Sequence, residues 1–171
     1  QCLAELSGTF LLVFFGVGSV QASVLTGAQV GIWQVAVVWG FGVSLAIYAT
    51  SAVSGAHLNP AITLALTAYR GFPLRRAALY ILAQFSGAVL AGATLYGIFS
   101  RLITGFEAAA GIVRGHAGSE LSAMVFGEYF PNPAMAASMP ALAHVTMPLA
   151  MLAEGVGTAL LALVIFIVTD S

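Results

Sequence analysis

The chain has 171 residues, of which 60% are hydrophobic and only 6% are charged. Because a soluble domain typically carries about 25% charged residues, this composition excludes an ordinary water-exposed surface. A formal net charge of −1 likewise excludes the basic footprint of a nucleic-acid-binding protein. The single cysteine, Cys2, has no second thiol and no His/Cys cluster near it, so we expect neither a metal nor a cofactor. The expected partner is a lipid bilayer.

The first two expected membrane spans lie in a long charge-free segment. Residues 6–69, 64 positions in all, contain no Asp, Glu, Lys or Arg, whereas one spanning helix needs about 20 residues. We predict spans near residues 3–25 and 32–52, separated by a turn-prone stretch at residues 26–29. Residues 53–69 of the charge-free segment then belong to neither span.

Residues 53–69 predict a short helix that enters the membrane without crossing it. Asn59 is a typical N-cap residue, and Pro60 is favoured at the first position of a helix. About ten residues at 1.5 Å per residue give roughly 15 Å, which is half the thickness of the hydrocarbon core. We therefore expect a re-entrant loop followed by a half-helix.

Basic residues set the expected orientation. Arg70, Arg75 and Arg76 follow the half-helix, and such a cluster is typical of a cytoplasmic loop. Counting spans from this cluster places the N-terminus in the cytoplasm of a multi-pass protein of the plasma or inner membrane. The remaining elements are a third span, a long extracytoplasmic loop and a fourth span, expected near residues 74–100, 101–147 and 148–171.

The two ends of the chain repeat each other. Residues 4–12 and 153–161 match at six of nine positions, at an offset of 149. Since three spans separate the copies, the second copy enters the membrane with opposite polarity, as in the inverted repeats of many transport proteins. Residues 1–100 then form the first repeat, and the counterpart of Asn59 falls near position 208. We therefore expect the chain to begin inside a longer protein and to stop within its second repeat.

The candidate site is the loop before the half-helix. Non-helical backbone at membrane depth is tolerated where it lines a water-filled path, and there its carbonyls would accept hydrogen bonds while the Asn59 amide donates to a solute oxygen. The half-helix N-terminus adds a partial positive charge that disfavours cations. Taken alone, the Asn-Pro pair also fits an ordinary helix cap, but the charge-free surroundings favour a pore. The residues concerned are Gly55, Ala56, His57, Leu58, Asn59, Pro60 and Ala61.

Four candidate side chains, one of them His57 of this loop, have competing interpretations. Glu5 and Glu154 lie in apolar spans, where an ionisable group indicates a functional site; the alternative is solvation at a helix end, which suits Glu5 better than Glu154. His57 fits a proton relay or an orienting role, and the lack of an intramembrane partner favours the second. Trp39 lies in the middle of a span, where packing or lipid contact is the default interpretation.

The segment at residues 54–65, Ser-Gly-Ala-His-Leu-Asn-Pro-Ala-Ile-Thr-Leu-Ala, resembles the first signature loop of the major intrinsic protein family of aquaporins. The patterns Glu-x-x-Gly-Thr at Glu5 and Glu154, and Ala-Gln-Phe-Ser-Gly-Ala at residues 83–88, resemble the family as well. The resemblance covers nearly the whole chain.

The resemblance implies an all-α, inverted-repeat bundle of six spans, with two facing half-helices and one pore in each subunit of a homotetramer. This chain would contribute four spans and one re-entrant half-helix. The position 20 residues before the motif Asn is commonly Trp in glycerol facilitators and Phe in water channels, and here it is Trp39. Residues 106–115 also look closer to the glycerol facilitators. The family's two membrane glutamates brace the dipping loops, a role that Glu5 and Glu154 would take.

This sequence departs from the family pattern by lacking the second Asn-Pro-Ala loop, the arginine that follows it, and the fifth and sixth spans. Residues 132–134 spell the same tripeptide, but they precede the fourth span instead of following it. We predict a simple loop turn there.

The leading functional hypothesis is passive permeation of small uncharged solutes, namely glycerol or similar polyols, together with water. Two alternatives remain: a water-selective, urea or metalloid channel, and, from another class, a non-conducting structural or regulatory membrane subunit. We expect no enzyme, because Glu5, His57 and Glu154 form no recognisable triad or metal set. The 171 residues alone are expected to form no conducting pore, since their half-helix has no partner.

Overall fold

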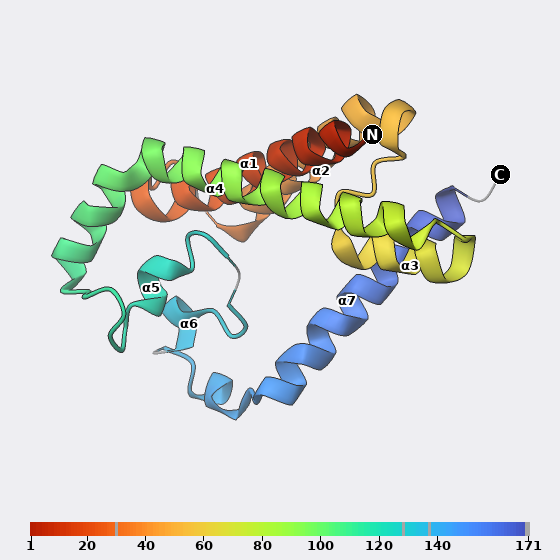
Figure 1. The fold of residues 1–171 in the computed structure, drawn as a ribbon. Coiled ribbons are helices and arrows are strands. Elements are labelled where there is room, and N and C mark those ends of the chain that lie inside the picture. The colour runs from red at the N-terminus through yellow and green to blue at the C-terminus, as the bar shows by residue number, and fades with distance from the viewer. Residues whose placement is uncertain (30, 128, 137, 170–171) are drawn as a thin grey trace. The chain divides into compact units, whose positions relative to one another are not determined.

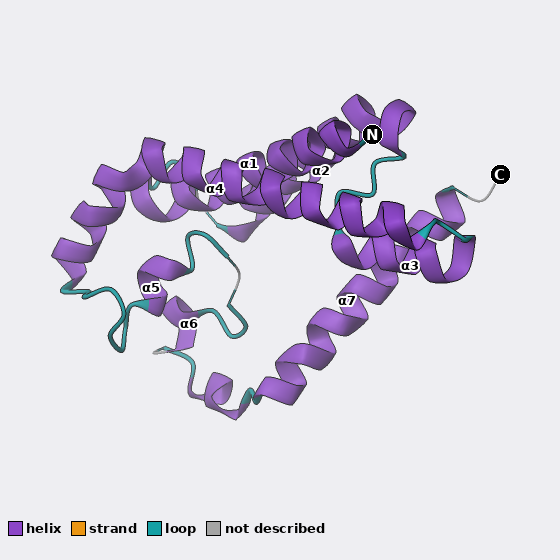
Figure 2. Ribbon diagram, in the orientation of Figure 1, coloured by secondary structure: helices purple, strands orange, loops and turns teal. Residues whose placement is uncertain are grey.

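The computed structural model describes residues 1–29, 31–127, 129–136 and 138–169, and every regular element in these ranges is a helix (Figure 2). The chain divides into two compact units, residues 1–127 and residues 128–171. The elements in chain order are α1 (Cys2–Thr26), α2 (Ile32–Ser54), α3 (Pro60–Arg70), α4 (Leu74–Ala110), α5 (Glu120–Ala123), α6 (Pro133–Ala136), the 3₁₀ turn η1 (Pro140–His144) and α7 (Met147–Val168).

The first unit is built on three long helices, with α1 packed against both α2 and α4 (Figure 1). Helix association in lipid relies on close van der Waals packing, which small residues permit. Gly16 of α1 lies directly under the indole ring of Trp39 on α2. Gly87 of α4 lies against the backbone of α1 at Leu6. Two glycines thus set how closely the three helices approach.

The half-helix α3 lies against α4 and has its own start and stop signals. Asn59 caps its first turn, Pro60 occupies the first position, and Gly71 ends it with a left-handed φ of 69°. Its 11 residues correspond to about 16 Å, roughly half of the hydrocarbon core. The element expected within residues 53–69 is therefore present as a loop followed by a helix too short to cross the membrane.

Helix α4 runs ten residues beyond the end at residue 100 that the sequence predicted for the third span. Nothing between Arg101 and Ala110 breaks a helix, and the first left-handed residue is Gly111, with a φ of 66°. Its 37 residues give about 55 Å, well above the ~30 Å of a hydrocarbon core. One end of α4 therefore lies outside the core, and the loop expected over residues 101–147 is partly helical.

The second unit contains α6, η1 and α7. Helix α7 begins after Thr146 with Pro148 in its first turn, one residue before the expected fourth span, and none of its residues is buried. Within the described ranges, four helices are long and apolar enough to cross a membrane: α1, α2, α4 and α7. At residues 132–134 the structure has a helical turn, α6, in place of the simple loop turn that the sequence predicted.

The close approach of α4 to α1 predicts different effects for two glycines on one helix. A Cβ at Gly87 would collide with the Leu6 carbonyl oxygen, whereas a Cβ at Gly92 would meet nothing within 4 Å. We expect Gly87→Ala to lower the free energy of unfolding by about 1–3 kcal/mol. Gly92→Ala should be neutral or stabilising by up to about 1 kcal/mol. Unfolding titrations with dodecyl sulfate in mixed micelles measure both, and equal midpoints for the two variants would contradict this packing.

Candidate functional site

The loop before α3 is held by one buried carboxylate on α1. Glu5 has no exposed surface, and its Oε1 accepts hydrogen bonds from the Ser54 hydroxyl at 2.6 Å and the His57 backbone N–H at 3.0 Å. Its Oε2 accepts from the Leu58 backbone N–H and the Gln84 side-chain amide, both at 2.8 Å. One side chain therefore ties together the end of α2, the loop and α4.

These bonds also decide where the loop carbonyls point. In a trans peptide the N–H and the preceding C=O point in opposite directions. Because Glu5 holds the N–H groups of His57 and Leu58, the carbonyls of Ala56 and His57 are directed away from the carboxylate. The Ala56 N–H donates to the Ser54 hydroxyl oxygen at 3.1 Å, which turns the Gly55 carbonyl in the same manner. Within the described residues, no hydrogen-bond donor contacts these three carbonyl oxygens.

The fourth carbonyl that the sequence placed in this row, that of Leu58, has a different environment. It accepts a long hydrogen bond, 3.5 Å, from the Thr9 hydroxyl of α1. Ala56 and Leu58 adopt left-handed φ values of 50° and 51°, a conformation that costs a residue with a side chain about 1–2 kcal/mol. Such strain persists where surrounding contacts determine the conformation, and here the Glu5 hydrogen bonds do so.

Asn59 uses one half of its amide locally and leaves the other half available. Its Oδ1 accepts a hydrogen bond from the Ala61 backbone N–H at 2.8 Å, which caps α3 behind Pro60. Within the described residues, its Nδ2 group donates to nothing. The side chain is partly exposed, so a donor is presented at the start of the half-helix, where the helix dipole also contributes a partial positive charge.

Thr63, one turn into α3, connects this end of the helix to its neighbours. Its hydroxyl donates to the Asn59 carbonyl at 3.0 Å and accepts from the Gln84 amide at 3.0 Å. The His57 Nδ1 atom lies 3.3 Å from the same oxygen. The Thr63 hydroxyl oxygen lies nearer the Asn59 carbonyl than Nδ1, and with its proton directed to that carbonyl Nδ1 is the donor in this contact. With this assignment we expect a neutral imidazole to carry its proton on Nδ1 and to leave Nε2 as an acceptor.

Aromatic rings enclose His57. The Phe72 ring centroid lies 4.6 Å from that of the imidazole, and the Tyr80 ring centroid lies at 5.0 Å. The Tyr80 hydroxyl donates to the Ser54 carbonyl at 2.9 Å, which fixes the end of α2 against α4. His57 is only 9% exposed, so contacts with three elements set its position.

Two further residues that the sequence singled out have different surroundings. Trp39 packs on Gly16, and its indole N–H is buried without a partner in the described chain. No described hydrogen bond or ring contact links Trp39 to the Asn59 loop. Glu154 belongs to the second unit, and its side chain forms no hydrogen bond or ion pair with the described residues there. Within the first unit, the structure thus brings Glu5, His57 and Asn59 together and leaves Trp39 apart.

Sequence reasoning missed the roles of Gln84, Thr63 and Tyr80. Gln84 is 1% exposed and Thr63 is fully buried. A polar side chain in an apolar span is a signal in itself, because its groups need partners that lipid does not provide. The partners cannot be read from spacing, since Gln84 and Glu5 are 79 positions apart.

The chemistry available here is hydrogen bonding without a reaction. Among the described residues no group of three His, Cys, Asp or Glu side chains is placed to hold a metal. Three outward carbonyls beside one amide donor can replace part of the hydration shell of a polar molecule. The fold and this loop define a helical membrane protein with one short helix, α3, that follows an irregular loop with outward backbone carbonyls.

Comparison with known proteins agrees with that class. The family model described as "Major intrinsic protein" matches residues 1–171, and the chain belongs to this family. It is 46% identical over 170 residues to a glycerol uptake facilitator protein of Pseudomonas aeruginosa and 44% identical over 170 residues to one of Escherichia coli (strain K12). Each alignment covers 99% of this chain and 57% of the relative, so the chain spans little more than half of their length.

A solved structure is similar as well. The aquaglyceroporin from Plasmodium falciparum matches with a TM-score of 0.56 and 32% identity, over 61% of this chain and 43% of that chain. The all-α membrane bundle predicted from the sequence is confirmed by the family match and by this structure. The resemblance to the major intrinsic protein family is likewise confirmed, and the protein is a multi-pass membrane protein.

Removing the charge from Glu5 tests whether its carboxylate holds the loop. In Glu5→Gln one acceptor oxygen becomes an NH₂ group that faces N–H donors, so at least one buried donor loses its partner, at about 1–3 kcal/mol each. We expect the free energy of unfolding to fall by at least about 1 kcal/mol in the same detergent titration. Glu120→Gln, at an exposed carboxylate at the start of α5, is the control and should change it by less than about 0.5 kcal/mol. Equal losses in the two variants would count against the bracing role.

The Thr63 network predicts a particular protonation pattern for His57. In Thr63→Val the Nδ1–H loses its acceptor, so the neutral ring should shift toward the Nε2–H form, whereas Thr63→Ser should retain the native pattern. The ¹⁵N chemical shifts of the imidazole nitrogens report this directly in histidine-labelled protein. His116 and His144 serve as internal references. An unchanged Nδ1–H signal in Thr63→Val would show that another group holds that proton.

Proposed function

We propose that this chain forms part of a channel for passive permeation of small uncharged solutes, with glycerol as the main substrate and water also passing. The observation that carries the proposal is the row of three carbonyls, at Gly55, Ala56 and His57, that no donor among the described residues contacts, next to the unbonded Nδ2 group of Asn59. A polar backbone edge of this kind at membrane depth is tolerated only where it lines a cavity or a path. Pore lining by these residues is therefore the function that this geometry supports best.

The same geometry favours neutral solutes over ions. Successive acceptors and one donor suit hydroxyl groups and water, which both donate and accept. A cation would approach the positive end of the α3 dipole, and an anion would face a row of carbonyl oxygens. The one ionisable side chain in the loop, His57, is enclosed by Phe72 and Tyr80, which supports an orienting role for it instead of a proton relay.

Glycerol is favoured by two observations. The relatives described above are glycerol uptake facilitators, and Trp39 offers a broad apolar surface where the resemblance implies an outer constriction. The arginines at the end of α3 and in the first turn of α4, Arg70, Arg75 and Arg76, support a cytoplasmic N-terminus by the positive-inside rule. Assembly as a homotetramer, and bracing of a second dipping loop by Glu154, belong to the same proposal because the family pattern implies them.

Flux through the full-length protein that contains this chain tests the proposal. Asn59→Asp retains the oxygen that caps α3 and removes the Nδ2 donor, so the folded loop should survive while solute recognition weakens. We expect glycerol permeability in proteoliposomes, measured by stopped-flow light scattering, to fall by about tenfold, the equivalent of one lost hydrogen bond of ~1.4 kcal/mol.

The chain contains a matched control for this variant. Asn132 makes the same cap, with its Oδ1 accepting from the Ala134 N–H at 2.9 Å, in the other unit. Asn132→Asp should leave glycerol flux within twofold of the native value. Native protein that passes water but no glycerol would assign a water-selective channel, and native protein that passes neither would support the non-conducting alternative.

A further inference from the structure

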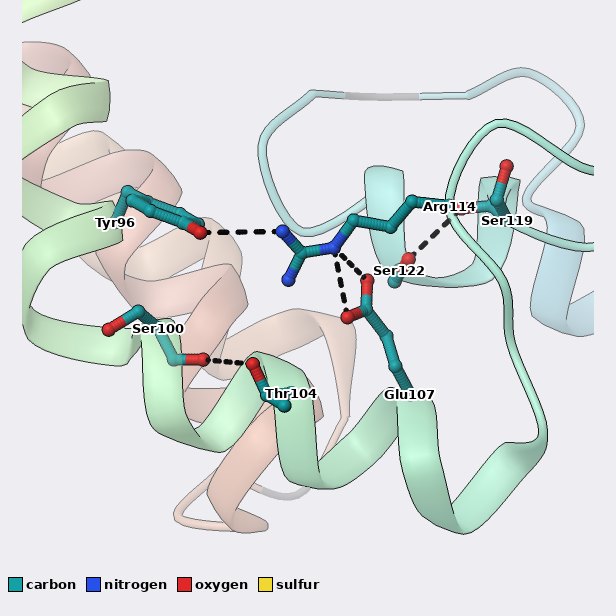
Figure 3. Close-up of polar contacts among 7 residues, drawn as sticks. All are labelled: Tyr96, Ser100, Thr104, Glu107, Arg114, Ser119 and Ser122. Carbon is teal, nitrogen blue, oxygen red and sulfur yellow. Dashed lines mark hydrogen bonds and ion pairs between the residues drawn. The ribbon is translucent and has the colours of Figure 1, made fainter.

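A cavity at the far end of α4 is separate from the Asn59 loop and lies wholly within the first unit (Figure 3). Its volume is about 270 Å³, close to the lower limit of about 300 Å³ for small-molecule sites. At ~30 Å³ per water, it has room for roughly nine water molecules. The residues that carry its chemistry are Tyr96, Ile103, Glu107, Arg114, Ser119 and Phe126.

An ion pair closes one wall of this cavity and cancels its charge. The Arg114 Nε–H donates to both Glu107 carboxylate oxygens, at 2.8 and 3.0 Å, and an Nη1–H donates to the Tyr96 hydroxyl at 3.3 Å. The hydrogen bond to Glu107 raises the pKa of Arg114 above its ordinary value, so the pair stays ionised and the wall has no net charge. The pair also holds residues 111–114 back against α4 (Figure 3).

Several hydrogen-bonding groups of the wall remain unused. Within the described residues, Arg114 Nη2 and the Ser119 hydroxyl have no partner, and the Tyr96 hydroxyl accepts a bond but donates none. The other walls are apolar: the rings of Tyr96 and Phe126 lie 6.3 Å apart between centroids, and Ile103 is 3% exposed. A ligand with both hydroxyl and C–H groups would form hydrogen bonds on one side of the cavity and pack against the aromatic rings on the other.

We propose that this cavity is a binding site for small neutral polyols, distinct from the Asn59 loop. A neutral wall gives an anion or a cation no net attraction, and an apolar ligand would leave the free donors without partners, which is unfavourable. A chain of about three to five carbons with adjacent hydroxyls satisfies both walls within the available volume. The proposal depends on the proposed function only for the choice of glycerol as the probe.

The test reads occupancy of the cavity by protection of an introduced thiol. In the full-length protein that contains this chain, reconstituted in nanodiscs with the exposed Cys2 replaced by Ser, Ser119→Cys places a thiol in the cavity wall. The control is Thr104→Cys on the exposed surface of α4, one turn from Glu107 and outside the lining (Figure 3). We expect glycerol to slow maleimide labelling of Ser119→Cys in a saturable way, whereas equal concentrations of 1-propanol or glycerol 3-phosphate should not. Labelling of Thr104→Cys should be unaffected.

Adding Tyr96→Phe to Ser119→Cys retains the ring and removes one donor, so half-maximal protection should need about three- to tenfold more glycerol. Equal protection by 1-propanol, or an unchanged half-maximal concentration in Tyr96→Phe, would overturn the site. Absence of protection would overturn it too.

This test separates the inference from the proposed function, because labelling measures binding and not flux. A channel that conducts glycerol with this cavity empty would refute this inference alone. Protection in a protein without flux would refute only the proposed function.

Discussion

The Glu5 carboxylate is the interaction on which the rest of the first unit depends. It lies on α1 but bonds to Ser54 at the end of α2, to the loop N–H groups at His57 and Leu58, and to Gln84 on α4. If it is taken away, the loop loses two backbone hydrogen bonds that offset the strain of its left-handed residues, and the carbonyls of Ala56 and His57 lose their common direction. The same side chain therefore sets both the orientation of the loop and the packing of the helices around it.

Burying such a carboxylate is costly, and the structure offsets the cost without a basic partner. The ion pair between Glu107 and Arg114 lies at the other end of the unit from Glu5. Glu5 accepts four hydrogen bonds from neutral donors, which supply partners to both of its carboxylate oxygens. A lysine or arginine partner would bring a positive charge to the loop and compete for the carbonyls. Neutral donors anchor the loop and leave its carbonyls directed outward.

Much of the fold could be predicted from the sequence, because apolar length and the Asn59-Pro60 start signal are local properties. The helix that contains the predicted third span continues ten residues past residue 100, because hydropathy falls at Arg101 while a helix continues until its backbone meets a breaker, here Gly111. Of the site, Glu5 and the loop were accessible as an ionisable group and an irregular segment in apolar surroundings. The hub at Thr63 and Gln84 was not, because hydrogen bonds between segments distant in sequence follow from packing, which no spacing encodes.

This chain contains two Asn-Pro-Ala tripeptides, and comparing them shows which features belong to the tripeptide and which depend on the surrounding residues. At residues 59–61 and 132–134 the Asn Oδ1 accepts the N–H two residues on, at 2.8 and 2.9 Å, so the local cap is the same. Only the first copy follows a loop whose backbone N–H groups are bonded to a buried carboxylate and whose carbonyls point outward. The second starts a four-residue helix in a loop. The tripeptide encodes a helix start, and the proposed path for solutes requires in addition the charge-free surroundings and the hydrogen bonds of Glu5.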